Sequence, residues 1–176
     1  MANRQALRDL QSRLADRLQA ARSEGVVASW LAVQCGSVDY LLPLEQSGEI
    51  FPLTTLQTVP YTRDWFIGVA NLRGGLFGIV DMHSFVSKGK ASVRTEALRS
   101  QCRLVALNPA LEINCAVLVD QLLGLRSAQA FAEVTAPDAE APDFFGNVYA
   151  DATGRRWQEI NLQKLARQGE FLSIAS

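Results

Sequence analysis

From Ser29 onward the chain is a succession of short apolar runs separated by turn residues, and this pattern limits the folds open to it. The runs are rich in Val, Ile, Leu and Phe, which is typical of β-strands. Their regular spacing favours a small barrel or sandwich over a sheet built from strand–helix–strand units. About ten such runs occur, at residues 29–35, 39–44, 48–53, 65–72, 76–82, 102–107, 113–120, 123–131, 144–151 and 156–162.

The segment before these runs has a helical period instead. Its leucines recur three or four residues apart and charged residues fill the other faces, which predicts an amphipathic helix over residues 1–24. Gly25 is a suitable end, because glycine readily adopts the positive φ common at helix C-termini. The helix either packs on the β-domain or docks a partner or a second copy, and the pattern leaves both open. The leucines are Leu7, Leu10, Leu14 and Leu18.

Residues 25–170 are expected to form one domain, with two sets of about five strands that suit a pair of small barrels. A polar, basic segment at residues 87–99 separates the two sets. Residues 133–143 are rich in Ala, Pro and acidic side chains, and we expect them to form a flexible acidic loop. A short C-terminal helix is predicted at residues 161–168, where two leucines share a face.

The charge balance and the cysteines restrict the partners and the compartment. With 17 basic and 18 acidic residues the net charge is -1, so no global field recruits nucleic acid or an acidic membrane surface. No apolar run is long enough to span a bilayer, and the N-terminus lacks the apolar core of a signal peptide. The three cysteines are scattered through apolar runs, as buried reduced thiols are. We therefore expect a cytoplasmic protein with no nucleic-acid partner and no membrane insertion.

Residues that catalyse reactions or bind metals are sparse. The one histidine, His83, lies close to Asp81 and Ser84, but neighbours on an extended chain point to opposite faces and do not form a nucleophilic triad. One histidine and three separated cysteines do not supply a metal site. The stretch SKGKAS at residues 87–92 lacks the spacing of a phosphate-binding loop. These absences predict no enzyme activity, no cofactor and no bound metal.

Residues 68–75 read GVANLRGG and lie between two apolar runs. Gly74 and Gly75 are expected to reverse the chain, because glycine turns without Cβ strain. Arg73 then projects beside the turn, with no acidic residue near it in the sequence. Taken alone, this pattern is also that of a surface arginine next to an ordinary hairpin turn.

A longer pattern around this stretch resembles the signature of the CheW family of chemotaxis adaptors. In that family a strand ends in G-V-x-N-L-R-G, and the next apolar strand closes on a V-D pair, as at Val80 and Asp81 here. The segments YLLPLEQSGEIFPL, CRLVALN, INCAVLVDQLLGL and GRRWQEINLQKLAR resemble further parts of the family, so the likeness covers residues 30–167. Two positions depart from the family pattern: Gly78 replaces a frequent proline, and Asn161 a frequent aspartate.

The resemblance implies a mainly β fold of two small five-stranded SH3-like β-barrels, here with an N-terminal amphipathic helix and a short C-terminal helix. It implies a non-catalytic adaptor that joins the cytoplasmic tip of a methyl-accepting chemoreceptor to the regulatory domain of a CheA-type histidine kinase. The leading helix and the wording LFGIVD resemble the PilI-like branch, which serves type IV pilus twitching motility.

The family's binding positions carry over to seven residues of this chain. In the family, positions like Gly68 and Leu125 lie near the receptor groove between the barrels. The strand that corresponds to the one bearing Glu49 belongs to the first barrel, which meets the kinase. The resemblance implies that Arg73 serves either surface. Each position also has a purely structural interpretation, such as tight strand packing for Gly68 or a core role for Leu125. The seven residues are Glu49, Ile50, Gly68, Asn71, Arg73, Gly74 and Leu125.

An alternative of another class stays open from the residues alone. The chain is then a small-ligand-binding β-barrel, or an enzyme whose reactive residues converge only in three dimensions. A deep pocket lined by Asp81, His83 and Asp120 favours that alternative. A shallow groove between two barrels favours the adaptor.

Overall fold

The computed structural model describes residues 5, 8–9, 11–15, 28–89 and 93–176. The described residues among 5–15 are helical and exposed, while the other residues of the helix expected over 1–24 lie outside the described part of the chain. The full extent of that helix therefore stays a prediction. Within the described residues, no helix is long and apolar enough to cross a bilayer.

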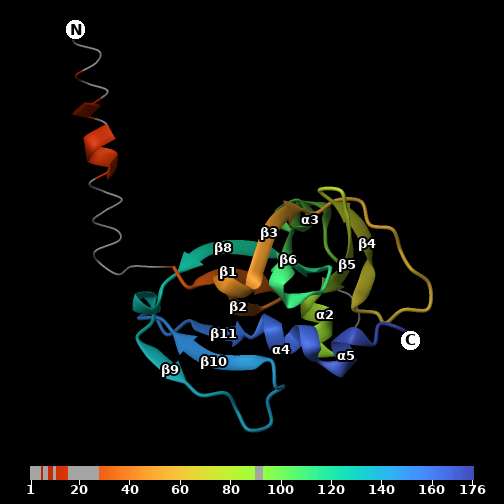
Figure 1. The fold of residues 1–176 in the computed structure, drawn as a ribbon. Coiled ribbons are helices and arrows are strands. Elements are labelled where there is room, and N and C mark those ends of the chain that lie inside the picture. Colours follow the sequence, from red (N-terminus) through yellow and green to blue (C-terminus); the bar gives the residue numbers. More distant parts are fainter. Residues whose placement is uncertain (1–4, 6–7, 10, 16–27, 90–92) are drawn as a thin grey trace.

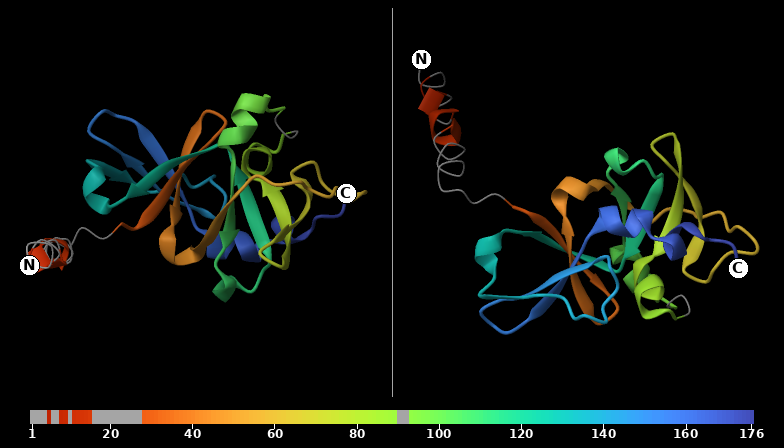
Figure 2. Two further views of the ribbon diagram at one scale, coloured as in Figure 1. Left: turned by 90° about the horizontal axis from the view of Figure 1, so that it is seen from above. Right: turned by 60° about the horizontal axis from the view of Figure 1, so that its bottom comes forward.

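The strands form two mixed sheets that lie side by side (Figures 1 and 2). The first sheet has six strands in the order β8-β1-β2-β11-β10-β9, and the second has five in the order β3-β6-β7-β5-β4. The strands of the first sheet are β1 (Trp30–Cys35), β2 (Val38–Pro43), β8 (Gln121–Arg126), β9 (Glu133–Thr135), β10 (Phe145–Ala150) and β11 (Arg156–Ile160). Those of the second are β3 (Ser47–Pro52), β4 (Phe66–Leu72), β5 (Gly75–Asp81), β6 (Arg103–Leu107) and β7 (Cys115–Val119).

The mainly β class is confirmed, but the division into two sets of five strands is wrong in count and in order. The sixth strand of the first sheet is β9, at the start of the segment 133–143 that was expected to be a loop. It pairs with β10. The sheets also do not divide at residues 87–99, because β2 pairs with β11 in parallel, through Tyr40 and Gln158. The first sheet therefore contains strands from both ends of the chain, and the second sheet is an insertion between them.

Most predicted strands form where expected, because side-chain alternation matches a half-buried sheet. The run predicted at 123–131 is a strand only to Arg126, where β8 ends, and its remainder contains a 3-10 turn. In β4, residues 66, 68, 70 and 72 are all buried while the residues between them are not. Strand β7 is buried along its whole length, since it is the central strand of its sheet. One cluster of buried apolar side chains joins the sheets and includes Leu31 and Val33 from the first and Val105 and Val117 from the second. The two sheets thus share a core.

Short helices cover the ends of the sheets. The expected C-terminal helix is confirmed as α4 (Leu162–Arg167), whose N-terminus is capped by the Asn161 side chain. It is followed by α5 (Gly169–Leu172), whose Phe171 ring packs against Trp65 and Phe85 of the second half. The segment expected as a basic loop also includes part of α3 (Glu96–Gln101), and α2 (Met82–Ser87) precedes it. In the residues that the structure describes, the 3-10 turns are η1 (Leu44–Gln46), η2 (Pro109–Leu111) and η3 (Ala128–Ala130).

Candidate partner-binding site

The β4–β5 hairpin presents the centre of the GVANLRGG stretch. Leu72 pairs with Gly75, so the reversal is made by Arg73 and Gly74 rather than by the two glycines. Both turn residues have positive φ, 50° and 82°, which is the arrangement of a type I′ hairpin turn. The Asn71 side chain accepts a hydrogen bond from the Gly74 backbone N–H at 3.0 Å. Asn71 and Gly74 thus shape the turn that carries Arg73.

Gly68 has a structural role in the same strand. Its φ is +139°, and a Cβ atom at this position would lie 2.5 Å from the backbone oxygen of Gln57. That close approach allows Gln57 and Val69 to exchange two backbone hydrogen bonds, of 2.8 and 2.9 Å. The bridge joins the segment after β3 to β4, the two edge strands of the second sheet, and so draws the sheet into a closed curve.

Arg73 carries the charged group of this motif, and its side chain points toward solvent. Its side chain is 77% exposed, and its guanidinium lies 2.7 Å from the carboxylate of Glu49 on β3. A non-glycine residue at positive φ is uncommon and costs of order 1 kcal/mol. Such strain persists where the surrounding structure holds the residue, and it is often found at functional sites.

A depression of about 310 Å³ adjoins this ion pair. Its floor is apolar and includes Phe51, Phe77 and Ile113, while Glu49 and Arg73 stand among its lining residues. We call Glu49, Arg73 and this depression the hairpin surface. An apolar floor beside an accessible arginine matches the composition of energetically important protein contacts.

The structure divides the other expected binding residues between the two sheets. Ile50 follows Glu49 on β3 and is 39% exposed. Leu125 lies on β8, an edge strand of the first sheet, and is 57% exposed. It is therefore not a core residue. Glu49, Asn71, Arg73 and Gly74 come together at the hairpin, while Leu125 belongs to the other half of the molecule.

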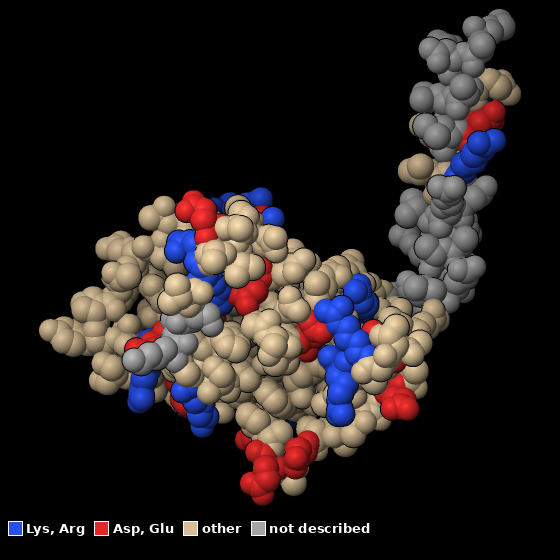
Figure 3. Space-filling view, turned by 180° about the vertical axis from the view of Figure 1, so that it is seen from behind, with Lys and Arg blue, Asp and Glu red and all other residues tan. Residues whose placement is uncertain are grey.

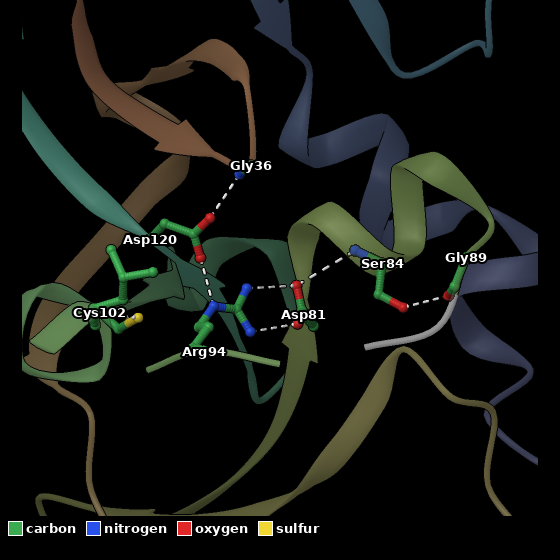
Figure 4. Close-up of polar contacts among 8 residues, drawn as sticks. Gly36, Asp81, Ser84, Gly89, Arg94, Cys102 and Asp120 are labelled. Carbon is green, nitrogen blue, oxygen red and sulfur yellow. Dashed lines mark hydrogen bonds and ion pairs between the residues drawn. The ribbon is translucent and has the colours of Figure 1, made fainter. Parts of the chain in front are cut away.

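In the described part of the chain, the depression beside Asp81 does not bring together the three residues of the enzymatic alternative, Asp81, His83 and Asp120. Arg94 lies between Asp81 and Asp120 and binds both carboxylates (Figure 4). His83 is on α2, and its ring packs over Gly36 of the β1–β2 turn. The depression beside Asp81, about 270 Å³, is lined mainly by apolar residues and by Arg94 and Arg99, but by neither His83 nor Asp120.

Arg94 is the polar residue that sequence reasoning missed. Its guanidinium contacts Asp81 at 2.7 and 3.1 Å and Asp120 at 2.5 Å. Burial alone lowers the pKa of Arg94, but the hydrogen bonds to both carboxylates and the attraction of their charges together outweigh burial and raise that pKa above its usual value. The three residues lie on separate parts of the chain, so no local spacing identifies the group.

The thiols and surface charges supply no further reactive group in the described part of the chain. All three cysteines are free and buried. Burial raises the pKa of Cys115 to about 12, so its thiol stays neutral and unreactive near pH 7. No three His, Cys, Asp or Glu side chains among the described residues are placed to hold a metal ion. On the face seen in Figure 3, small groups of basic and of acidic side chains lie among broad uncharged areas, with one acidic group at the lower edge.

The structure thus combines two curved sheets, an outward-facing charged hairpin and a buried Asp81 carboxylate that is paired with Arg94. The family model of the CheW-like domain matches residues 29–170 of this chain. The chain therefore belongs to this family of chemosensory scaffolds.

One protein similar in sequence and one similar in fold accompany this match. The chain is 26% identical over 168 residues to Protein PilI of Pseudomonas aeruginosa, covering 93% of this chain and 89% of that protein. Its fold is similar to the crystal structure of the scaffolding protein TtCheW from Thermoanaerobacter tengcongensis. That likeness has a TM-score of 0.60 at 14% identity, over 76% of this chain and 88% of the other.

Proposed function

We propose that this protein is an adaptor that couples the cytoplasmic tip of a methyl-accepting chemoreceptor to the regulatory domain of a CheA-type histidine kinase. Membership of the CheW-like family supports the adaptor role. Likeness to PilI along most of the chain supports a system that controls type IV pilus twitching motility. In this proposal the protein acts in the cytoplasm at membrane-associated receptor arrays, and each curved sheet corresponds to one SH3-like barrel of the family.

The observation that carries the proposal is the geometry of Arg73. Three residues of its motif have structural tasks: Gly68 allows the Gln57 bridge, while Asn71 and Gly74 form the turn. Arg73 is mostly exposed and strained, and its ion pair with Glu49 contributes only ~0–1 kcal/mol at such exposure. Since fold stability does not require an arginine there, we assign Arg73 and Glu49 to partner binding.

The exposed position of Leu125 supports a second contact on the other sheet. We assign Leu125 to the receptor, whose helical hairpin offers an apolar face to such a side chain. We assign Glu49 and Ile50 to the kinase domain, and Arg73 to either partner. Each contact is small, but tethered neighbours in an array raise the effective concentration and strengthen the assembly.

The proposal is tested by measuring the affinity of purified receptor tip and of kinase regulatory domain for Arg73→Glu. We expect binding of at least one partner to weaken by about tenfold or more, equivalent to ~1.4 kcal/mol. Lys88→Glu is the matched control, because the Lys88–Glu170 pair spans 3.9 Å and has nearly the same exposure, 75% and 49%. Unchanged affinity of Arg73→Glu for both partners, in a protein that remains folded, contradicts the proposal.

A further inference from the structure

The chain passes between the two sheets at two places, and one of them is a single residue. The chain enters the second sheet through η1, between β2 and β3, and returns to the first through Asp120, between β7 and β8. The Asp120 backbone N–H donates to the Gln34 carbonyl at 2.9 Å. Its carboxylate accepts a hydrogen bond of 2.6 Å from the Gly36 backbone N–H. Asp120 is thus a crossing point anchored to the first sheet.

Arg94 ties this crossing point to the second sheet. Its Nε donates to one Asp120 oxygen, while Nη1 and Nη2 donate to the two oxygens of Asp81 at the end of β5 (Figure 4). The side chains of Arg94, Asp81 and Asp120 are 10%, 0% and 21% exposed. A guanidinium is planar and presents its donors in a fixed fork, so it holds two carboxylates at a defined angle.

A second contact spans the sheets at the same place. The His83 ring of α2 lies against the β1–β2 turn, and a Cβ atom on Gly36 would lie 2.6 Å from that ring. Gly36 therefore meets His83 on one side and the Asp120 carboxylate through its N–H. Gly36 in this turn is therefore a point at which two contacts between the halves of the molecule meet.

We propose that Arg94 is a positioning residue that fixes the angle between the two sheets about Asp120. The shared apolar core resists separation of the sheets, but hydrophobic contact is non-directional and specifies their relative rotation weakly. The ion cluster of Arg94, Asp81 and Asp120 is directional, and it therefore specifies how one sheet is rotated relative to the other. If the proposed function is correct, Arg94 also aligns Leu125 on the first sheet with the hairpin surface on the second, so that one adaptor presents both partners in a set geometry.

The test compares two aspartate variants that each lose one carboxylate facing an arginine. Asp120→Asn keeps the buried Arg94–Asp81 pair intact, but its one amide oxygen satisfies only one of the Gly36 and Arg94 donors. Asp39→Asn is the control, because Asp39 binds Arg155 through two hydrogen bonds within the first sheet and does not span the two sheets.

The measurement is the distance between spin labels on the free protein. Labels are placed at the exposed residue Ala152, in the turn between β10 and β11 of the first sheet, paired in turn with the exposed residues Ala110 in η2 and Gln101 at the end of α3. The native cysteines are buried and do not compete for the label. We expect one narrow distance distribution for the wild type and for Asp39→Asn, and a broadened or displaced one for Asp120→Asn in at least one pair.

Arg94→Lys keeps the charge but loses the fork, and we expect it to broaden or shift the same distribution. Distributions of Asp120→Asn and Arg94→Lys that match the wild type in both label pairs overturn the proposal. The readout needs no partner, so it is independent of the adaptor function. Binding of receptor and of kinase is also measured separately and together. If Asp120→Asn binds each partner alone but no longer forms the ternary assembly, Arg94 also aligns the two binding surfaces.

Discussion

The guanidinium of Arg73, in the β4–β5 turn, lies 2.7 Å from the carboxylate of Glu49 on β3, so residues of two separate elements form one exposed ion pair on the second sheet. The pair joins the β4–β5 turn to β3, next to the apolar depression. Because both side chains remain accessible, a partner can replace the internal contact with an external one at small cost. The paired residues therefore act as one surface rather than as two independent contacts.

Arg73→Asn is expected to separate binding from stability. Asparagine tolerates the positive φ of this turn, and Asn-Gly is a preferred type I′ sequence, so backbone strain falls while the exposed ion pair is lost. We expect the free energy of unfolding to change by less than about 1 kcal/mol, while partner binding weakens. Urea denaturation and titration calorimetry measure the two quantities. A large loss of stability makes Arg73 a structural residue.

Gly68→Ala is expected to destabilise the fold by about 2–4 kcal/mol, from positive φ and from a Cβ that overlaps the Gln57 backbone. Gly74→Ala is the matched control. Its φ is also positive, +82°, but nothing lies within 4 Å of the added carbon, so only backbone strain of about 1 kcal/mol remains. If the urea midpoints of Gly68→Ala and Gly74→Ala do not differ, the close approach of Gly68 to Gln57 contributes nothing to the loss of stability.

Leu125→Ser is expected to reduce receptor binding and leave kinase binding unchanged. The side chain is 57% exposed, so its replacement removes little buried apolar area and the thermal midpoint changes little. Leu172→Ser is a suitable control, because Leu172 is 55% exposed and lies near the C-terminus on α5. Equal effects of both substitutions on receptor affinity contradict a specific role for Leu125.

Stability is expected to fall at alkaline pH because of buried thiols. Burial raises the pKa of Cys115 from 9.0 to about 12, so the folded state retains a proton that the unfolded state loses. The stabilisation is complete below about pH 9 and is lost progressively between about pH 9 and 12, at about 1.4 kcal/mol per pH unit for this thiol. Urea unfolding from pH 8 to 10.5 measures the slope.

Burial also raises the pKa of Cys35, which adds to the same fall. Cys115→Ala should make the pH dependence shallower, even though the cavity it leaves lowers stability at every pH. If the free energy of unfolding of Cys115→Ala falls with pH as steeply as that of the wild type, Cys115 does not cause the alkaline loss of stability.

Local features were accessible from the sequence because they depend on neighbouring residues. The strand periodicity, the short C-terminal helix and the β4–β5 hairpin are specified by alternation and by side chains a few positions apart. The hairpin was nevertheless misplaced by one residue, since Arg73 itself adopts the positive φ that glycine usually provides. The pairing of Leu72 with Gly75 and the hydrogen bond from Gly74 to the Asn71 side chain define the turn there.

The amino-acid sequence alone therefore determined the β class, the individual strands and the motif that marks the family. Only the tertiary structure decided that β2 pairs with β11, that Glu49 meets Arg73, and that Arg94 joins Asp81 to Asp120. These contacts join residues far apart in the chain. Their formation depends on the free energy of the whole packed arrangement, including loop closure and burial, and not on any local period.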